Sequence, residues 1–176
     1  MFKREKFNIK DTVEVWSVRD DGIFNELILK TCNNPSIFDK FLKLIGFKKF
    51  ANDIIMDIGV QDVATFIYNR YNYIQNGVAD THMSDATLTN LISPLPTARV
   101  LATKGYDTTY ITNDTILFTG VFTNNSGDTQ IIKESGLFKD ISTSASDVMF
   151  CRQTFSYSVL GGSTYGVIWK IVISRG

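Results

Sequence analysis

The last third of the chain, residues 114–173, contains four apolar runs of strand length separated by turn-forming residues. The runs cover residues 116–122, 131–138, 148–155 and 167–173. In the first run both alternating sets of side chains are largely apolar, which is typical of a strand buried on both faces. In the last run apolar residues such as Trp169 and Ile171 alternate with a more polar set, which predicts a strand with one well-buried face. Together the runs predict a mainly β fold, an antiparallel β-sandwich of the jelly-roll kind.

The residues between these runs are of types that form tight turns. Residues 124–128 are Asn, Asn, Ser, Gly and Asp, which tolerate positive φ angles and predict a hairpin turn. Gly161 and Gly162 predict another turn before the last strand. The predicted core residues of the sandwich are Phe118, Phe122, Leu137, Phe138, Phe155, Trp169 and Ile171.

The N-terminal part of the chain predicts a hairpin followed by a helix. Residues 12–18 alternate, residues 23–31 could form a returning strand, and an Asp-Asp-Gly turn signal lies between them at residues 20–22, which favours two paired strands. An apolar stripe at helical spacing over residues 37–45 predicts an amphipathic helix with Ser36 as its N-cap. Lysines occupy its other faces, and they fit a solvated helix surface better than a contact with DNA.

The middle of the chain has weaker patterns. Residues 61–75 permit a helix or a strand, because their apolar residues have helical spacing but are β-branched or aromatic; we expect a helix. Residues 76–112 are polar and contain two prolines, which predicts a long loop with a short helical turn. The expected organisation is a single domain over residues 1–176. In it, the hairpin, helix and loop of residues 1–112 pack on a core of strands from residues 113–176.

Length and charge narrow the possible functions. A chain of 176 residues buries roughly 70% of its unfolded surface when it folds, so it can fold alone. Its 18 basic and 18 acidic residues give zero formal net charge. The chain as a whole therefore lacks the positive field that favours nucleic-acid binding. A neutral chain also has little electrostatic protection against self-association, which suits a subunit of an assembly.

The cysteines and the N-terminus indicate a cellular compartment. Cys32 and Cys151 are far apart and form no Cys-x-x-Cys pair, so neither a disulfide scaffold nor a zinc site is expected. Assembly in a reducing cytoplasm fits best. The charged first residues are followed by no apolar stretch of signal-peptide length, so secretion and contact with a membrane are not expected.

Residues able to carry out catalysis are few. His82 is the only histidine, so a metal site built from several histidines is excluded, and it would have to act as a base beside Cys151 or a serine. It lies in a polar stretch without a nucleophile-elbow motif. Asp20 and Asp21 are adjacent in a turn, which suits solvation better than cooperation. No glycine-rich phosphate loop is present. We therefore expect no enzymatic activity, no cofactor and no metal.

Glu134 and Arg152 are ionic residues within otherwise apolar strands. An unpaired charge in such a place costs several kcal/mol. We therefore expect the two to pair with each other, or across a subunit boundary, and to set strand registry. Cys151, beside Arg152, is expected to be a small buried apolar residue.

Some of these residues resemble a family of small phage virion proteins. The resemblance is carried by Ile-Lys-Glu-Ser-Gly-Leu-Phe at residues 132–138, by Met-Phe-Cys-Arg at residues 149–152 followed by Phe155, and by Val-Ile-Trp-Lys-Ile at residues 167–171. A fainter upstream resemblance includes Asn33 and Asn34 before an apolar helix, residues 54–59 as a strand end, residues 85–88, and Arg99. Where the family pattern has Gly-Thr-Gly, this chain has Gly59, Val60 and Gln61 followed by a longer polar insertion.

The resemblance implies a virion structural protein that is assembled in the host cytoplasm. Its expected partners are copies of itself and other virion proteins, such as portal, neck, tail or capsid subunits. A repeated subunit of a neck or tail ring is preferred, because the long middle loop suits interlocking subunits at an interface; capsid decoration is the alternative. A glycan-binding module is a further hypothesis, in which exposed tyrosines stack on host sugars. Its candidate residues are Tyr106, Tyr110, Tyr157 and Tyr165.

Overall fold

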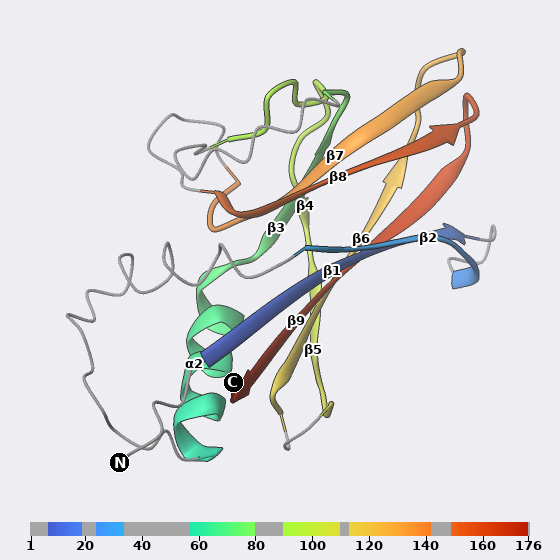
Figure 1. The fold of residues 1–176 in the computed structure, drawn as a ribbon. Helices are drawn as coiled ribbons and strands as arrows, with labels where there is room; N and C mark the ends of the chain where they lie inside the picture. The colour runs from blue at the N-terminus through green and yellow to red at the C-terminus, as the bar shows by residue number, and fades with distance from the viewer. Residues whose placement is uncertain are drawn as a thin grey trace.

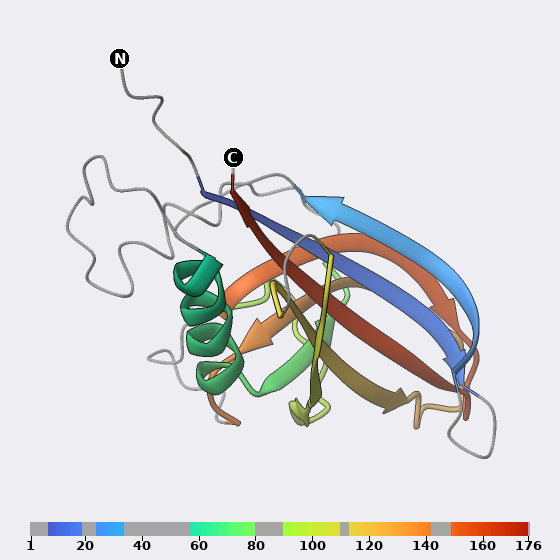
Figure 2. The ribbon, with the colours of Figure 1, turned by 90° about the horizontal axis from the view of Figure 1, so that it is seen from below.

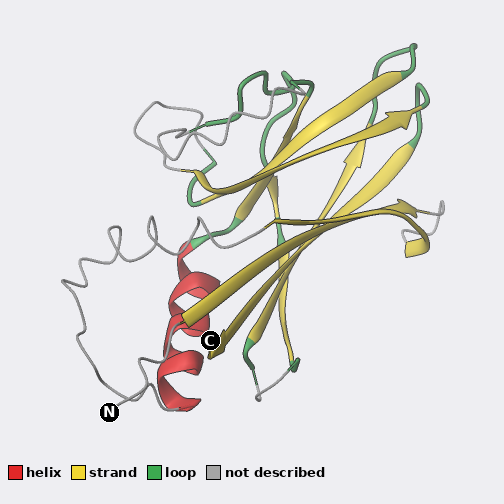
Figure 3. Cartoon of the chain, in the orientation of Figure 1, coloured by secondary structure: helices red, strands yellow, loops and turns green. Residues whose placement is uncertain are grey.

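The structure, a computed structural model, describes residues 7–18, 24–33, 57–79, 90–109, 113–141 and 149–175. These residues form one helix and nine strands (Figures 1 and 3). In chain order the elements are β1 (Phe7–Val18), β2 (Phe24–Asn33), α2 (Asp57–Arg70), β3 (Tyr73–Gly77), β4 (Val100–Leu101), β5 (Thr103–Asp107), β6 (Thr115–Thr123), β7 (Gln130–Phe138), β8 (Met149–Val159) and β9 (Thr164–Arg175). The predicted helix at residues 36–45 lies outside the described residues.

The strands form two stacked antiparallel sheets. The five-stranded sheet has the order β2-β1-β9-β6-β5, and the four-stranded sheet has the order β4-β3-β7-β8. All of the strand pairs are antiparallel. The predicted mainly β fold, an antiparallel β-sandwich, is confirmed.

The last four strands are nested: β7 pairs with β8 in one sheet, and β6 pairs with β9 in the other. The chain therefore crosses between the sheets after β6 and crosses back after β8, which is the jelly-roll manner of closing a sandwich. The predicted hairpin turn at residues 124–128 is wrong, because the strands on either side of it lie in different sheets. The turn at Gly161 and Gly162 is present, and Gly162 has a φ of 76°.

Asn124 links the two crossing connections, which lie at the end of the sandwich away from α2 (Figure 1). Its Nδ2 donates to the carbonyl oxygens of Asp128 at 2.9 Å and Val159 at 3.0 Å. Its backbone N–H donates to Ser163 O at 2.9 Å, and its carbonyl accepts from Gly162 N at 2.8 Å. One buried side chain thus joins connections that are far apart in sequence.

The N-terminal half contributes strands to both sheets. The predicted N-terminal hairpin is present as β1 and β2, but β1 also pairs along its length with β9. Val13 and Val15 lie opposite Trp169 and Val167 in that pairing, and all of them are buried. Residues 1–112 therefore do not simply pack on a core formed by residues 113–176. They supply strands to the sandwich itself.

The middle of the chain differs from the sequence expectation. The predicted helix at residues 61–75 is helical only to Arg70, because β3 begins at Tyr73. Asp57, Ile58 and Gly59 begin the helix and do not end a strand. The loop expected over residues 76–112 contains β4 and β5, which join the edges of the two sheets as one continuous segment. Ala102, between them, donates its N–H to Asn72 O at 2.8 Å.

The core lies between the sheets and is closed at one end by α2 (Figure 2). Val60, Ala64 and Ile67 repeat at helical spacing and are fully buried, so one face of α2 packs onto the sandwich. Six of the predicted core residues are buried: Phe118, Phe122, Leu137, Phe138, Trp169 and Ile171. Phe155 is half-buried and packs against them.

Candidate functional site

The structure brings Glu134 of β7 and Arg152 of β8 together. Arg152 Nε donates to Glu134 Oε2 at 2.6 Å, and the two side chains are 9% and 0% exposed. Glu134 lies opposite Thr154 and Arg152 lies opposite Gly136, so the pair is a diagonal contact across two neighbouring strands. Because both side chains are nearly removed from water, this pair differs in kind from a surface salt bridge.

The carboxylate of Glu134 also binds the backbone of residues 90–95. Its Oε1 accepts from Ser93 N at 2.8 Å, and its Oε2 accepts from Ile92 N at 3.2 Å. Two backbone hydrogen bonds also attach this segment. Val78 N donates to Ser93 O and Leu95 N donates to Asn76 O, both at 2.9 Å. Glu134 is therefore held by fixed donors of the protein and fastens an irregular segment to the four-stranded sheet.

Two polar contacts cross the interior from one sheet to the other. Trp169 Nε1 donates to Ser135 Oγ at 3.2 Å, and Asn76 Nδ2 donates to Tyr165 OH at 2.9 Å. Burial raises the pKa of Tyr165 to about 12, although its bond with Asn76 acts in the opposite direction. Neither partner, Asn76 nor Ser135, is predicted by the sequence patterns. The available signal was that buried Trp and Tyr side chains need hydrogen-bond partners.

Arg99 is a buried cation that was named only through the family resemblance. Its Nε donates to Gln75 Oε1 at 3.1 Å, and its Nη1 donates to Asp140 O at 2.9 Å. The guanidinium carbon lies 3.6 Å from the centre of the Phe138 ring. Burial lowers the pKa of Arg99, and the negative charge of Asp140 acts in the opposite direction. Arg99 thereby ties the segment before β4 to β3 and to the residues after β7.

The tyrosines of the glycan hypothesis do not form one surface. Tyr165 is buried, and its ring centre lies 6.1 Å from that of the half-buried Tyr157. Tyr106 is 38% exposed and stacks on Tyr68 with ring centres 4.5 Å apart. Tyr110 lies outside the described residues. The expectation that Tyr165 is exposed is wrong, because its ring fills the sandwich interior.

The other candidates for chemistry are Cys151, His82, Asp20 and Asp21. Cys151 is buried, and His82, Asp20 and Asp21 lie outside the described residues. Within the described ranges no group of three or more His, Cys, Asp or Glu side chains is placed to hold a metal ion. The described part of the chain contains no helix with the length and apolar character needed to span a membrane.

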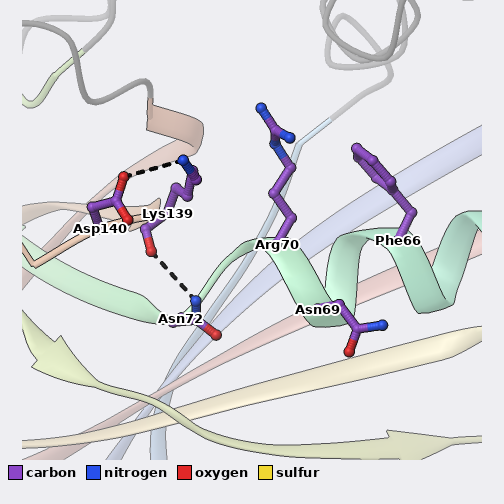
Figure 4. A pocket seen from close by; sticks show the side chains of 6 residues that line it. All are labelled: Phe66, Asn69, Arg70, Asn72, Lys139 and Asp140. Carbon is purple, nitrogen blue, oxygen red and sulfur yellow. Dashed lines mark hydrogen bonds and ion pairs between the residues drawn. The ribbon is translucent and has the colours of Figure 1, made fainter.

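An open depression of about 410 Å³ lies beside the C-terminal end of α2 (Figure 4). Asn72 Nδ2 donates to Lys139 O at 3.4 Å across it, and Lys139 Nζ lies 3.4 Å from Asp140 Oδ2. Arg70 and Phe66 extend from the same side of the helix, whereas Asn69 points away from them. The lining residues are Phe66, Asn69, Arg70, Asn72, Lys139 and Asp140.

Comparisons of this chain with protein-family models, with curated proteins and with solved structures find no match. What the chain does is therefore inferred from its own residues and contacts.

Proposed function

We propose that this chain is a non-enzymatic structural subunit of a bacteriophage particle, repeated around a ring or collar at the neck or tail. The sequence resemblance supplies the phage class, and the jelly-roll sandwich is compatible with it. The proposal rests mainly on one feature, an apolar row on the outer face of the five-stranded sheet. A repeated subunit would cover this row with its neighbour.

The row consists of residues that lie directly opposite one another on four neighbouring strands. Trp16 of β1 lies opposite Leu27 of β2 and Gly166 of β9, and Gly166 lies opposite Val121 of β6. Leu27 is 40% exposed and Val121 is 43% exposed. Side chains alternate along a strand, so the buried neighbours on β1 and β9 point to the core and the row points outward. Trp16 is half-buried between them and Gly166 is buried. Exposed apolar side chains that gather on one face of a sheet can mark a protein interface.

The bonds formed by the buried charged side chains support a structural role. Glu134 binds Arg152 and two backbone N–H groups, which accounts for three of its acceptor sites. Arg99 binds Gln75 and a backbone carbonyl. These charged groups hold strands and segments together, as expected of a subunit whose task is to keep a fixed shape.

The association is tested by the mass of the purified chain in solution. We expect a symmetric homo-oligomer, measured by light scattering coupled to size-exclusion chromatography. Val121→Lys should shift it toward the monomer, because a charge would be buried in the interface. Ser156→Lys is the matched control, since Ser156 is exposed on β8 of the other sheet. A wild-type chain that stays monomeric at high concentration, or two variants that behave alike, would contradict the proposal.

The position in the particle is tested by copy number. Quantitative mass spectrometry of purified phage particles should give a low copy number that matches one ring. A copy number comparable to that of the capsid subunit would instead indicate decoration of the head. If wild-type particles do not contain the chain, and particles also assemble in a phage that lacks it, the structural proposal fails.

A further inference from the structure

The depression beside the C-terminal end of α2 contains a cation, Arg70, one of whose donors is not used in a hydrogen bond with the described residues. Arg70 Nε is buried and has no hydrogen-bond partner among the residues that the structure describes. The hydroxyl of the next residue, Tyr71, is also buried, and the nearby charge of Arg70 lowers its pKa against the larger effect of burial. Buried donors are normally satisfied by protein or water, so an unsatisfied guanidinium nitrogen at the edge of an open depression points to a missing acceptor.

We propose that this depression binds the carboxylate or phosphate group of a small ligand, with Arg70 and Lys139 as its cationic contacts. A guanidinium presents a fork of N–H donors that matches the oxygens of these groups. Among the residues that the structure describes, Lys139 pairs with its neighbour Asp140 at 3.4 Å, and both side chains are about half exposed. Such an exposed pair is weak, so Lys139 is free to contact an incoming anion.

The local charge favours an anion although the whole chain is neutral. Lys104 Nζ donates to Tyr68 O at 2.6 Å and to Asn72 Oδ1 at 2.8 Å. The carbonyl end of a helix repels anions, and Lys104 offsets this effect because it binds one of the last carbonyls of α2. Two cations, Arg70 and Lys139, line the depression beside one carboxylate, Asp140, and Lys104 adds a third positive charge where it binds Asn72.

Phe66 adds an apolar surface next to the cation. The Arg70 guanidinium carbon lies 5.5 Å from the centre of the Phe66 ring, and both side chains extend from the same side of α2 (Figure 4). The depression has a volume of about 410 Å³ and is open to solvent, so it would hold a small ligand on one side. The arrangement therefore suits an anionic group attached to a small apolar or ring-shaped body, which would lie against the part of Phe66 that its packing on the core leaves exposed.

The proposal is tested by titrating the full-length chain with benzoate, with benzamide and with inorganic phosphate. Benzoate and benzamide have nearly the same shape and differ in charge, so they separate anion recognition from contact with Phe66. Amide chemical shifts in two-dimensional NMR locate the site and give the affinity. We expect saturable shifts near Arg70 and Lys139 with benzoate, and at least about tenfold weaker binding of benzamide.

Substitutions then identify the contacts. Arg70→Met should weaken benzoate binding by roughly tenfold, and Arg70→Lys by less, because it keeps the charge and loses the fork. Lys139→Met should also weaken binding, whereas Lys133→Met, farther along β7, should not. Thermal unfolding of each variant verifies that it is folded; if Arg70→Met is not, Arg70→Lys and Lys139→Met carry the test. Equal binding of benzoate and benzamide, unchanged affinity in folded Arg70 and Lys139 variants, or no saturable binding of benzoate or phosphate would overturn the proposal.

Discussion

Glu134 lies directly opposite Gly77 in the pairing of β7 with β3, and its side chain occupies the space that a side chain at position 77 would need. A Cβ on Gly77 would lie 2.5 Å from Ser93 O and 2.7 Å from Glu134 Cγ. The absence of a side chain at Gly77 lets the carboxylate reach the amides of Ile92 and Ser93. The glycine and the glutamate therefore act together to hold residues 90–95 on the four-stranded sheet.

Gly77→Ala should destabilise the fold strongly. The new methyl group would overlap a backbone oxygen and the Glu134 side chain, and neither can move without breaking the attachment of residues 90–95. We expect a loss of about 2 kcal/mol or more in the free energy of unfolding, measured by urea denaturation. Gly105→Ala is the control, because a Cβ there meets nothing within 4 Å. Equal stability of the two variants would contradict the tight packing around Gly77.

The pair of Glu134 and Arg152 should couple strongly in a double-mutant cycle. Removing either charge alone leaves the other buried, so Glu134→Gln and Arg152→Met should each cost about 3 to 5 kcal/mol in the free energy of unfolding. The double variant should lose much less than the sum. The exposed pair of Lys139 and Asp140 is the reference, with an expected coupling of about 0 to 1 kcal/mol. A coupling for Glu134 and Arg152 no larger than that would refute their role in registry.

Asn124→Asp should destabilise the two crossing connections. The substitution keeps the shape of the side chain but replaces the Nδ2 donor with an oxygen that faces the carbonyls of Asp128 and Val159. We expect a loss of about 3 kcal/mol at pH 7, because a buried charge also loses its hydration. Asn125→Asp, at the exposed neighbouring position, should change stability by less than about 0.5 kcal/mol. Thermal denaturation of both variants measures the difference in their stability.

Removing the hydroxyl groups of Tyr165 and Tyr71 should have different effects at pH 7. Tyr165→Phe deprives Asn76 Nδ2 of its acceptor and should cost about 1 to 3 kcal/mol in the free energy of unfolding. Tyr71→Phe removes a buried hydroxyl that has no hydrogen bond of good geometry among the described residues and lies near the charge of Arg70, so it should cost less than about 1 kcal/mol. A larger loss for Tyr71→Phe than for Tyr165→Phe would contradict these hydrogen-bond assignments.

The wild-type chain should lose stability in alkali. Burial raises the pKa of both Tyr71 and Tyr165 to about 12 in the folded state, whereas an exposed tyrosine titrates near 10. Between these values the unfolded chain releases protons that the folded chain keeps, so the free energy of unfolding falls as pH rises. The loss is up to about 3 kcal/mol for each tyrosine. Urea denaturation from pH 8 to pH 12 measures it, and Tyr165→Phe should show a shallower decline than the wild type.

The four C-terminal strands could be predicted from sequence because alternation of side chains is a local property of an extended chain. The pairing of Glu134 with Arg152 could be inferred because a buried charge is costly wherever it lies. Which strands pair with one another could not be inferred in the same way. Residues 124–128 have the composition of a hairpin turn, but the strands that they join bind other partners, since each strand has two edges and can pair at either.

The sequence by itself determined that the chain forms buried strands, which side chains fill the core and that two ions need a partner. These follow from periodicity and from the cost of removing charge from water. The tertiary structure alone decided that β3 is a strand, because Gln75, Asn76 and Gly77 have polar or absent side chains. These residues are buried because each meets a partner from a distant part of the chain. Gln75 accepts a hydrogen bond from Arg99, Asn76 donates one to Tyr165, and Glu134 fills the space beside Gly77. Only the folded chain brings such partners within hydrogen-bonding distance.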